Sequence, residues 1–197
     1  MKLLHLDTSI TGENSISRQL TAHIVSTLIA QDKSLEITHH DLNREPVNYL
    51  SSASFTDENE KAHGAQYLQE FLDADILVIG APMYNFSVPA QLRSWIDRIA
   101  VAGKTFRYTA NGSEGLAGGK RVIIASVRGG YYNEESGLAA LDHQENYLKT
   151  VFGFLGITDV EFIRAEGVAT GADNKEKALN AAMSQIATLP SNKASAA

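Results

Sequence analysis

Cysteine is absent from the 197 residues of this chain. Its absence excludes a disulfide framework, a thiolate metal site and a cysteine nucleophile, and it suits a reducing compartment. Long apolar runs are missing as well, because no stretch approaches the roughly 18–20 residues that a transmembrane helix needs. The N-terminus, MKLLHLD, reaches an acidic residue too early to contain the apolar region of a secretory signal. We therefore expect a cytoplasmic protein without a membrane segment.

An excess of positive charge is also missing. The chain has 17 Lys and Arg residues against 23 Asp and Glu residues, a formal net charge of -6, which argues against a nucleic-acid-binding face. Its 44% hydrophobic and 20% charged residues are ordinary for a globular protein with a sizeable core. Because we find no internal repeat and no linker, we expect one domain over residues 1–189. Residues 190–197 (PSNKASAA) carry too little apolar surface to become ordered, so we expect a flexible tail there.

The signatures of several enzyme classes do not occur. Neither the G-x-S-x-G of many serine hydrolases nor the G-x-G-x-x-G of Rossmann dehydrogenases is present. Gly118-Gly119-Lys120 bears a faint likeness to a P-loop, but Glu114 and Arg121 stand where that motif requires a glycine and a hydroxyl residue. These three classes are therefore disfavoured.

The histidines give no metal-binding pattern in the sequence. His39 and His40 are adjacent on an expected strand, so they point to opposite faces and cannot share a metal ion. His5, His23 and His63 are single residues without a suitably spaced carboxylate or histidine. We predict no metal site and no metal cofactor.

Short apolar runs alternate along the chain with stretches whose apolar residues recur at helical spacing. Such alternation indicates an α/β protein with a parallel five-stranded sheet and right-handed crossovers, for which we expect the doubly wound order 2-1-3-4-5. A glycine-rich stretch around Asn111-Gly112 predicts a small hairpin beside this sheet. The expected strands span residues 3–6, 35–41, 76–81, 121–126 and 160–163. Three helices are expected to begin near residues 15, 56 and 89. A fourth should end at residue 155, and a fifth should cover residues 174–188.

The loop after the first strand is dense in hydroxyl groups and leads into a helix that begins near Ser15. Free N–H groups and the helix dipole favour an anion at such a position, and Ser9, Ser15 and Ser17 add uncharged donors. This pattern is typical of a phosphate site. The alternative is that Ser15 and Ser17 only cap the helix.

Two further loops follow core strands. Pro82-Met83-Tyr84-Asn85-Phe86 offers two aromatic rings and an amide, which suit a flat heterocycle with a polar edge. Val127-Arg128-Gly129-Gly130 has paired glycines, which allow the backbone to approach a ligand that a Cβ would keep away. In the expected strand order, both loops converge with the first one at the carboxyl-end crevice. A planar cofactor with a single phosphate, FMN, fits this combination best, because the glycine N–H groups would stabilise the negative charge of the reduced ring.

Four segments resemble the FMN-dependent NADH azoreductases, within the wider NAD(P)H:quinone oxidoreductase group of flavodoxin-like enzymes. They are PMYNF at 82–86, TFRYT at 105–109, RGG at 128–130, and YL at 147–148 with GFLGI at 153–157. The resemblance extends over nearly the whole chain. It implies a flavodoxin-like fold and a homodimer with FMN at the subunit interface. It further implies hydride transfer from NADH through FMN to small-molecule azo compounds or quinones.

The resemblance also assigns site residues. No acid–base pair stands out in the sequence, so we expect no catalytic residue beyond the flavin. Val127 departs from the Ser that members often carry, and Tyr132 departs from the His of some members. Tyr108, Tyr132 and Phe154 are expected to wall the substrate pocket, with the alternative that Phe154 is a core residue. The FMN contacts are expected to be Ser9, Ser15, Ile16, Ser17, Pro82, Met83, Tyr84, Asn85, Phe86, Val127, Arg128, Gly129 and Gly130.

A second class of function remains open beside the reductase. A flavodoxin-like electron carrier would hold FMN with the same loops and pass single electrons to protein partners. Such carriers tend to be more acidic than this chain, and the aromatic stretch at 106–108 is foreign to them. The sequence also leaves NADPH open as the donor, since it contains no motif specific for either nicotinamide.

Overall fold

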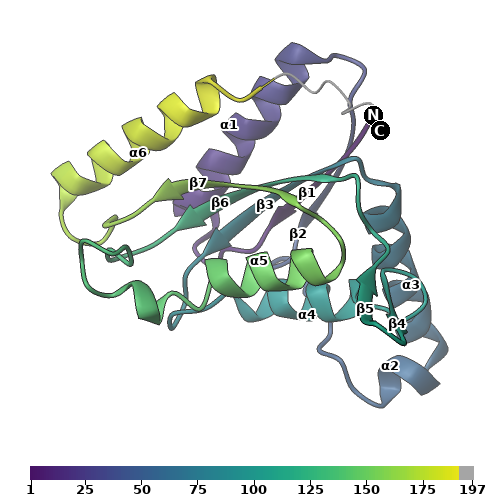
Figure 1. Ribbon diagram of the computed structural model, residues 1–197. Helices are drawn as coiled ribbons and strands as arrows, with labels where there is room; N and C mark the ends of the chain where they lie inside the picture. The colour runs from purple at the N-terminus through teal and green to yellow at the C-terminus, as the bar shows by residue number, and fades with distance from the viewer. Residues whose placement is uncertain (191–197) are drawn as a thin grey trace.

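Five parallel strands form the central sheet of the computed structural model, which describes residues 1–190 (Figure 1). Their spatial order is β2-β1-β3-β6-β7. Counted among the parallel strands alone, this order agrees with the predicted 2-1-3-4-5. The strands are β1 (Lys2–Asp7), β2 (Glu36–Asp41), β3 (Ile76–Pro82), β6 (Arg121–Val127) and β7 (Asp159–Ala165).

Burial of the strands explains why most of them are recognisable as apolar runs. Every residue of β3 is buried, and so are six of the seven residues of β6. Strands covered by helices on both faces exclude polar side chains, so they lack the alternation of a half-exposed sheet. The edge strand β2, EITHHD, has no buried residue, and its polar composition follows from that position.

Helices cover both faces of the sheet (Figure 1). On one face, α1 (Ile16–Gln31) and α6 (Ala172–Ala187) pack against the strands in a core that includes Leu20, Ile24 and Ile186. On the other, the core includes Phe71 and Trp95 and is covered by α3 (Glu58–Asp73), α4 (Ala90–Ile99) and α5 (Glu145–Phe154). A one-turn helix, α2 (Ala53–Thr56), and two 3₁₀ turns, η1 (Gly12–Asn14) and η2 (Ala139–Leu141), complete the helices of residues 1–190.

Gly80 allows α1 to approach β3 closely. A Cβ at this position would lie 3.3 Å from Asp7 Oδ1, 3.3 Å from Thr21 Cγ2 and 3.5 Å from Ser17 Oγ. Contacts of 3.3 Å are tighter than most side chains tolerate, so the bare glycine sets the distance between strand and helix. It thereby places the start of α1 beside the carboxyl end of β1.

The predicted hairpin is present as β4 (Phe106–Thr109) and β5 (Gly112–Gly115), which pair antiparallel. It packs against the end of α5, where Ala117 N–H donates to Leu155 O at 2.9 Å. Residue 155 leads into the amino end of β7, so the hairpin lies at the amino-end edge of the sheet. In Figure 1 it lies on the right, away from the arrowheads of β6 and β7.

Some boundaries differ from the sequence prediction. The helix expected from residue 56 is divided, because Asp57 takes an extended conformation and caps α3 by accepting from the N–H groups of Asn59 and Glu60. The last helix begins at Ala172, two residues before the predicted start. Residues 191–197 of the predicted tail lie outside the described part. Among residues 1–190, no helix combines the length and apolarity needed to cross a membrane.

Candidate functional site

A cavity of about 300 Å³ opens where β1, β3 and β6 end. This volume is at the lower end of the roughly 300–1,000 Å³ typical of small-molecule sites. The register of the sheet explains the convergence, because Pro82 lies beside Val127 and Met83 N–H donates to Val127 O at 2.8 Å. The lining residues are Ser9, Thr11, Asn14, Ser15, Ile16, Ser17, Pro82, Met83, Tyr84, Val127, Gly129 and Val168.

The N-terminus of α1 forms one wall of this cavity. Ser15 is the N-cap, and its Oγ accepts from the N–H of Arg18 at 3.3 Å. The hydroxyls of Ser15 and Ser17 lie 3.1 Å apart, and both residues are almost fully buried. The N–H groups of Ile16 and Ser17 have no hydrogen-bond partner within residues 1–190. Ser15 therefore caps the helix, and both serines line the cavity.

The turn after β3 forms the second wall. Asn85 and Phe86 have φ values of 49° and 68°, a left-handed conformation that non-glycine residues rarely adopt. Two hydrogen bonds between the backbones of Tyr84 and Ser87, each 3.0 Å, close this turn. The Tyr84 hydroxyl lies 3.3 Å from Ser9 Oγ and accepts from the N–H of Ile10 at 3.2 Å. These contacts fix the tyrosine ring against the first loop.

The third wall is the turn after β6. The N–H groups of Gly129 and Gly130 have no hydrogen-bond partner in the described part of the chain. Their carbonyls are held, since Gly129 O accepts from Ala169 N–H at 3.0 Å and Gly130 O accepts from Gly167 N–H at 2.9 Å. The turn is thus fixed on its carbonyl side and offers free donors.

Arg128 does not line the cavity, and its buried side chain anchors the turn after β6 through ion pairs with three carboxylates. It is 2% exposed. Its guanidinium lies 2.8 Å from Asp142, 2.6 Å from Glu145 and 3.1 Å from Glu166. Glu145 in turn binds Arg164 at 2.7 Å. Burial raises the pKa of Glu145, but the hydrogen bonds from Arg164 and the charge of Arg128 outweigh it and hold that pKa below its ordinary value.

Nine of the thirteen predicted cofactor residues line the cavity. Asn85, Phe86, Arg128 and Gly130 do not, although each lies within two residues of one that does. The structure adds Thr11, Asn14 and Val168. Thr11 and Asn14 belong to the hydroxyl-rich loop already singled out. Val168 follows β7, and only the sheet order could have indicated it, because its sequence surroundings carry no polar motif.

The three predicted pocket aromatics lie in two places. The Tyr132 ring contacts Phe86 edge to face at 6.0 Å, beside the cavity turn. The rings of Tyr108 and Phe154 pack on either side of Phe106, at 5.5 Å and 4.6 Å. Tyr108 is 77% exposed, whereas Phe154 is half-buried against the core. Tyr108 lies on the hairpin and Phe154 at the end of α5, so within one chain this pair and the cavity are at opposite ends of the sheet.

The sequence-based view of His5 as an isolated residue is wrong. His5 and His39 lie side by side in the register of β1 and β2, and both approach Asp7. His40 does point to the other face, as predicted, and contacts Glu70 at 2.7 Å. The pairing was missed because the two histidines are distant in sequence and meet only through strand pairing.

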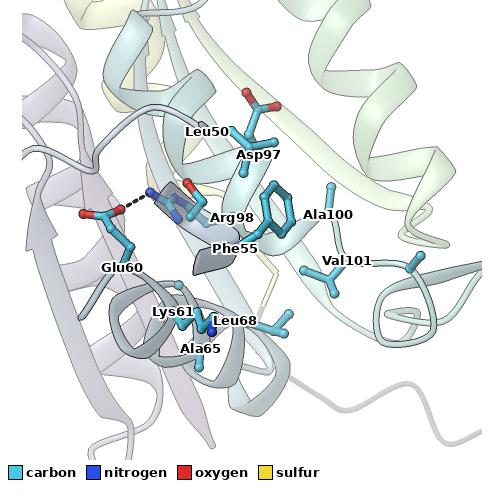
Figure 2. A pocket seen from close by; sticks show the side chains of 13 residues that line it. Leu50, Phe55, Glu60, Lys61, Ala65, Leu68, Asp97, Arg98, Ala100 and Val101 are labelled. Carbon is cyan, nitrogen blue, oxygen red and sulfur yellow. Dashed lines mark hydrogen bonds and ion pairs between the residues drawn. The ribbon is translucent and has the colours of Figure 1, made fainter. Parts of the chain in front are cut away.

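A larger cavity, of about 440 Å³, lies between α2, α3 and the end of α4. Figure 2 shows its apolar side chains, among them Leu50, Phe55 and Leu68, beside the ion pair between Arg98 and Glu60 at 2.6 Å. None of its lining residues comes from the loops that follow β1, β3 or β6. We therefore place the candidate site at the smaller cavity.

Comparison with known proteins agrees with this geometry. A family model described as a flavodoxin-like fold matches residues 1–189. The chain belongs to this flavodoxin-like family. The resemblance to FMN-dependent NADH azoreductases and quinone oxidoreductases is confirmed as well, by the relatives and solved structures that follow.

Relatives from two bacteria are each 53% identical to this flavodoxin-like chain. The protein of Stenotrophomonas maltophilia (strain K279a), an FMN-dependent NADH:quinone oxidoreductase, aligns over 98% of this chain and 96% of its own. A protein of the same name from Sinorhizobium medicae (strain WSM419) aligns over 95% and 96%.

Two solved azoreductase structures superpose closely on this chain. An azoreductase from Bacillus anthracis str. Sterne superposes with a TM-score of 0.86 at 28% identity, over 95% of this chain and 97% of that one. An FMN-dependent NADH-azoreductase from Bacillus anthracis str. Ames Ancestor, solved in complex with FMN, superposes with a TM-score of 0.85 at 25% identity, over 94% and 95%.

Proposed function

We propose that the chain is an FMN-dependent oxidoreductase that transfers hydride equivalents from NADH to quinones and to azo compounds. The observation that carries the proposal is the cavity at the ends of β1, β3 and β6, where a helix N-terminus, an aromatic turn and free glycine donors meet. It is supported by relatives named FMN-dependent NADH:quinone oxidoreductases and by a similar azoreductase solved with FMN.

The chemistry of the cavity fits the phosphate of FMN. The free N–H groups of Ile16 and Ser17 and the hydroxyls of Ser15 and Ser17 are uncharged donors at the positive end of a helix dipole. None of the described residues that line the cavity is acidic, so no carboxylate would repel the phosphate. We assign these residues and Ser9 to the phosphate end.

The other two walls fit the ring. Pro82, Met83, Tyr84, Asn85 and Phe86 would bind one face of the isoalloxazine, with the Tyr84 ring already held by hydrogen bonds. The turn 127–130 would direct the N–H groups of Gly129 and Gly130 toward the ring edge that becomes negative on reduction. Bound FMN supplies the hydride-transfer chemistry. The chain orients the ring and stabilises its charge.

The acceptor pocket of the proposal requires a homodimer. Tyr132 lies beside the cavity turn through its contact with Phe86. Tyr108 and Phe154 belong to the far end of the sheet, so they reach a carboxyl-end cavity only if that cavity belongs to a second copy. Aromatic rings that stack on flat molecules suit both quinones and azo compounds.

The purified protein gives a direct test. We expect a yellow protein that releases about one FMN per chain on denaturation and oxidises NADH steadily when a soluble quinone or an azo dye is added. The azo dye should be cleaved to aromatic amines. Because donor and acceptor would occupy one face of the ring in turn, double-reciprocal plots should be parallel, as in a ping-pong scheme.

Other outcomes separate the alternatives. An FMN protein that does not oxidise NADH with quinones but passes electrons to a redox protein would be a flavodoxin-like carrier. Absence of bound FMN after reconstitution would contradict the cofactor assignment. Intersecting plots together with a ternary complex would contradict the shared site while leaving the reaction intact.

A further inference from the structure

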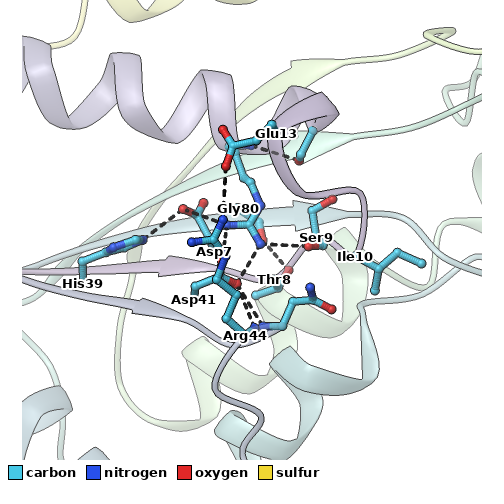
Figure 3. A network of polar contacts seen from close by, with 12 residues as sticks. Asp7, Thr8, Ser9, Ile10, Glu13, His39, Asp41, Arg44 and Gly80 are labelled. Atoms are coloured by element: carbon cyan, nitrogen blue, oxygen red, sulfur yellow. Dashed lines mark hydrogen bonds and ion pairs between the residues drawn. The ribbon is translucent and has the colours of Figure 1, made fainter.

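A cluster of two imidazoles and one carboxylate lies on the sheet face that α1 covers. Because β1 and β2 run parallel, His5 is paired with His39, and Asp7 follows two residues later on the same face. His39 Nε2 lies 3.0 Å from Asp7 Oδ2, and His5 Nε2 lies 3.4 Å from Asp7 Oδ1. Figure 3 shows the ring of His39 directed toward Asp7. The two imidazole rings are 4.4 Å apart.

We propose that His5, Asp7 and His39 form a binding site for one divalent transition-metal ion of the Zn²⁺ class. Two neutral imidazoles and a carboxylate are ligands that Zn²⁺, Co²⁺ and Fe²⁺ accept, with the remaining coordination position left to water. The hard cations Mg²⁺ and Ca²⁺ prefer oxygen ligands, so the imidazoles disfavour them.

The first supporting observation is an unsatisfied nitrogen. His5 is 8% exposed, and its Nε2 is buried without a hydrogen-bond partner in the described chain. Its contact with Asp7, at 3.4 Å, lacks the alignment of a hydrogen bond. A buried polar atom left unpaired costs free energy. A metal ion between His5 and Asp7 would engage that nitrogen.

The second observation is the spacing of the ligand atoms. One ligand atom from each residue lies within 4.8 Å of the others. Tetrahedral Zn²⁺ with bonds of about 2.0–2.1 Å needs neighbouring ligand atoms about 3.4 Å apart. The distances of 3.0 Å from His39 and 3.4 Å from His5 to Asp7 are close to this value and end on different oxygens of its carboxylate. The His39 side chain is 47% exposed on the edge strand, so it is free to make the small remaining adjustment.

The third observation is the support behind the carboxylate. Thr21 Oγ1 donates to Asp7 Oδ1 at 2.9 Å. Hydrogen bonds of this kind orient a ligand and raise the affinity of a metal site.

Charge around the cluster favours a cation on balance. A cavity of about 590 Å³ opens beside it and gives an ion a route from solvent. Arg18 lies 3.7 Å from Asp7 and opposes a cation, but Asp41 neutralises it with two bonds of 2.7 Å. Four carboxylates line this cavity against two guanidinium groups, a surplus of two negative charges: Asp7, Glu13, Asp41 and Glu45 against Arg18 and Arg44.

This site is separate from the proposed cofactor cavity. The two cavities share Ser15 as a lining residue, but none of the three ligands lines the cofactor cavity. The metal-site proposal is therefore independent of the oxidoreductase assignment, and its test does not require enzyme activity.

The test uses the full-length, tag-free holoprotein after dialysis against a chelator. Zn²⁺ is titrated by calorimetry, and Co²⁺ is titrated by its visible d–d bands, which report nitrogen ligation. We expect one ion per chain. His39→Asn should weaken binding by more than about 100-fold, because losing a whole ligand exceeds the roughly 10–100-fold effect of an outer-shell change. His40→Asn, on the neighbouring residue of the opposite face, should bind normally, and millimolar Mg²⁺ should not compete.

Three results would overturn the proposal. They are the absence of stoichiometric binding, equal affinity in wild type and His39→Asn, or an equal loss in His40→Asn. The first would leave the three residues as a metal-free His-Asp-His cluster. Circular dichroism monitors the fold of each variant. If His39→Asn does not fold, Asp7→Asn is titrated in its place, and unchanged affinity there would contradict the proposal equally.

Discussion

Two buried hydroxyl groups at the start of α1 can donate hydrogen bonds to an anion. Ser15 and Ser17 lie 3.1 Å apart, and the hydrogens of both hydroxyls cannot be directed at each other. At least one is therefore available to a ligand. A phosphate would also accept from the free N–H groups of the first helical turn.

Ser17→Asp tests this reading at a single residue. The new carboxylate repels a phosphate and removes a donor, so we expect FMN affinity to fall by about 100-fold or more, since each charge-assisted bond contributes roughly 1.5–3 kcal/mol. Ser17→Ala removes only the donor and should lose about tenfold. Affinity is measured by fluorescence titration of the apoprotein with FMN.

Ser26→Asp, on an exposed part of the same helix, is the matched control and should bind FMN normally. Unchanged affinity in a folded Ser17→Asp protein would mean that the phosphate binds elsewhere.

Glu145 predicts a pH dependence of stability. Its carboxyl pKa lies below the ordinary value of 4.5 in the folded state. A lowered pKa contributes stability above the unfolded-state value, and this contribution is lost as pH falls through the folded-state value. We therefore expect the unfolding midpoint to drop as the pH falls below about 4.5, the ordinary pKa of the group.

Glu145→Gln should flatten that drop and lower stability at neutral pH by about 3 kcal/mol, because Arg128 loses a buried partner. Denaturant unfolding at a series of pH values measures both effects. Glu114→Gln is the control, since its pair with Arg107 is exposed on the hairpin and should alter the pH curve little. Parallel curves for wild type and Glu145→Gln would show that other carboxyls dominate.

At the scale of elements, Gly115 allows the hairpin to pack closely against the chain that follows α5. A Cβ on Gly115 would overlap the backbone of Leu155 and Gly156, and Gly156 has a φ of 89°. The chain after α5 and the end of β5 thus touch backbone to backbone. This contact holds Phe106 and Tyr108 in place beside Phe154.

Gly115→Ala should therefore destabilise the protein by about 1–3 kcal/mol and loosen the hairpin. Gly153→Ala provides a matched control three residues from the same junction: it lies within α5, a Cβ there meets nothing within 4 Å, and a helical alanine should add about 0.5–1 kcal/mol. Thermal unfolding followed by circular dichroism compares the two variants. Equal stability of both would mean that the hairpin moves aside at no cost.

At the scale of the whole molecule, the placement of aromatic rings decides what one chain can do alone. The cavity and the pair formed by Tyr108 and Phe154 are at opposite ends of the sheet. One chain thus offers the cavity at the ends of β1, β3 and β6, with Tyr132 nearby, and a separate aromatic surface where the hairpin meets the end of α5. The cavity of one chain and the aromatic surface of another would form one pocket only in the homodimer proposed above.

Phe154→Ala tests that combination. If the ring stacks on the acceptor, the ratio of kcat/KM for a quinone to kcat/KM for an azo dye should change about threefold to tenfold, because an aromatic pair contributes about 0.5–1.5 kcal/mol. FMN content and gel-filtration volume should stay the same. A uniform change for all acceptors, or loss of folding, would assign Phe154 to the core.

The order of strands and helices, the parallel sheet and the three loops that line the cavity could all be predicted from the sequence. These features are local: apolar runs such as 76–81 mark buried strands, and residues such as Ser15 and Gly129 mark loops by their own backbone chemistry. Their convergence followed because doubly wound sheets bring the carboxyl ends of strands to one edge.

Which side chains meet across the sheet could not be predicted and became known from the three-dimensional structure. The cluster of His5, Asp7 and His39 depends on the register of β1 and β2, and a shift of one residue would turn every side chain of β2 to the other face. The separation of Phe154 from the cavity likewise depends on where α5 ends. Contacts of this kind join residues distant in sequence, and the physical cause that brings them together is the packing of the whole sheet.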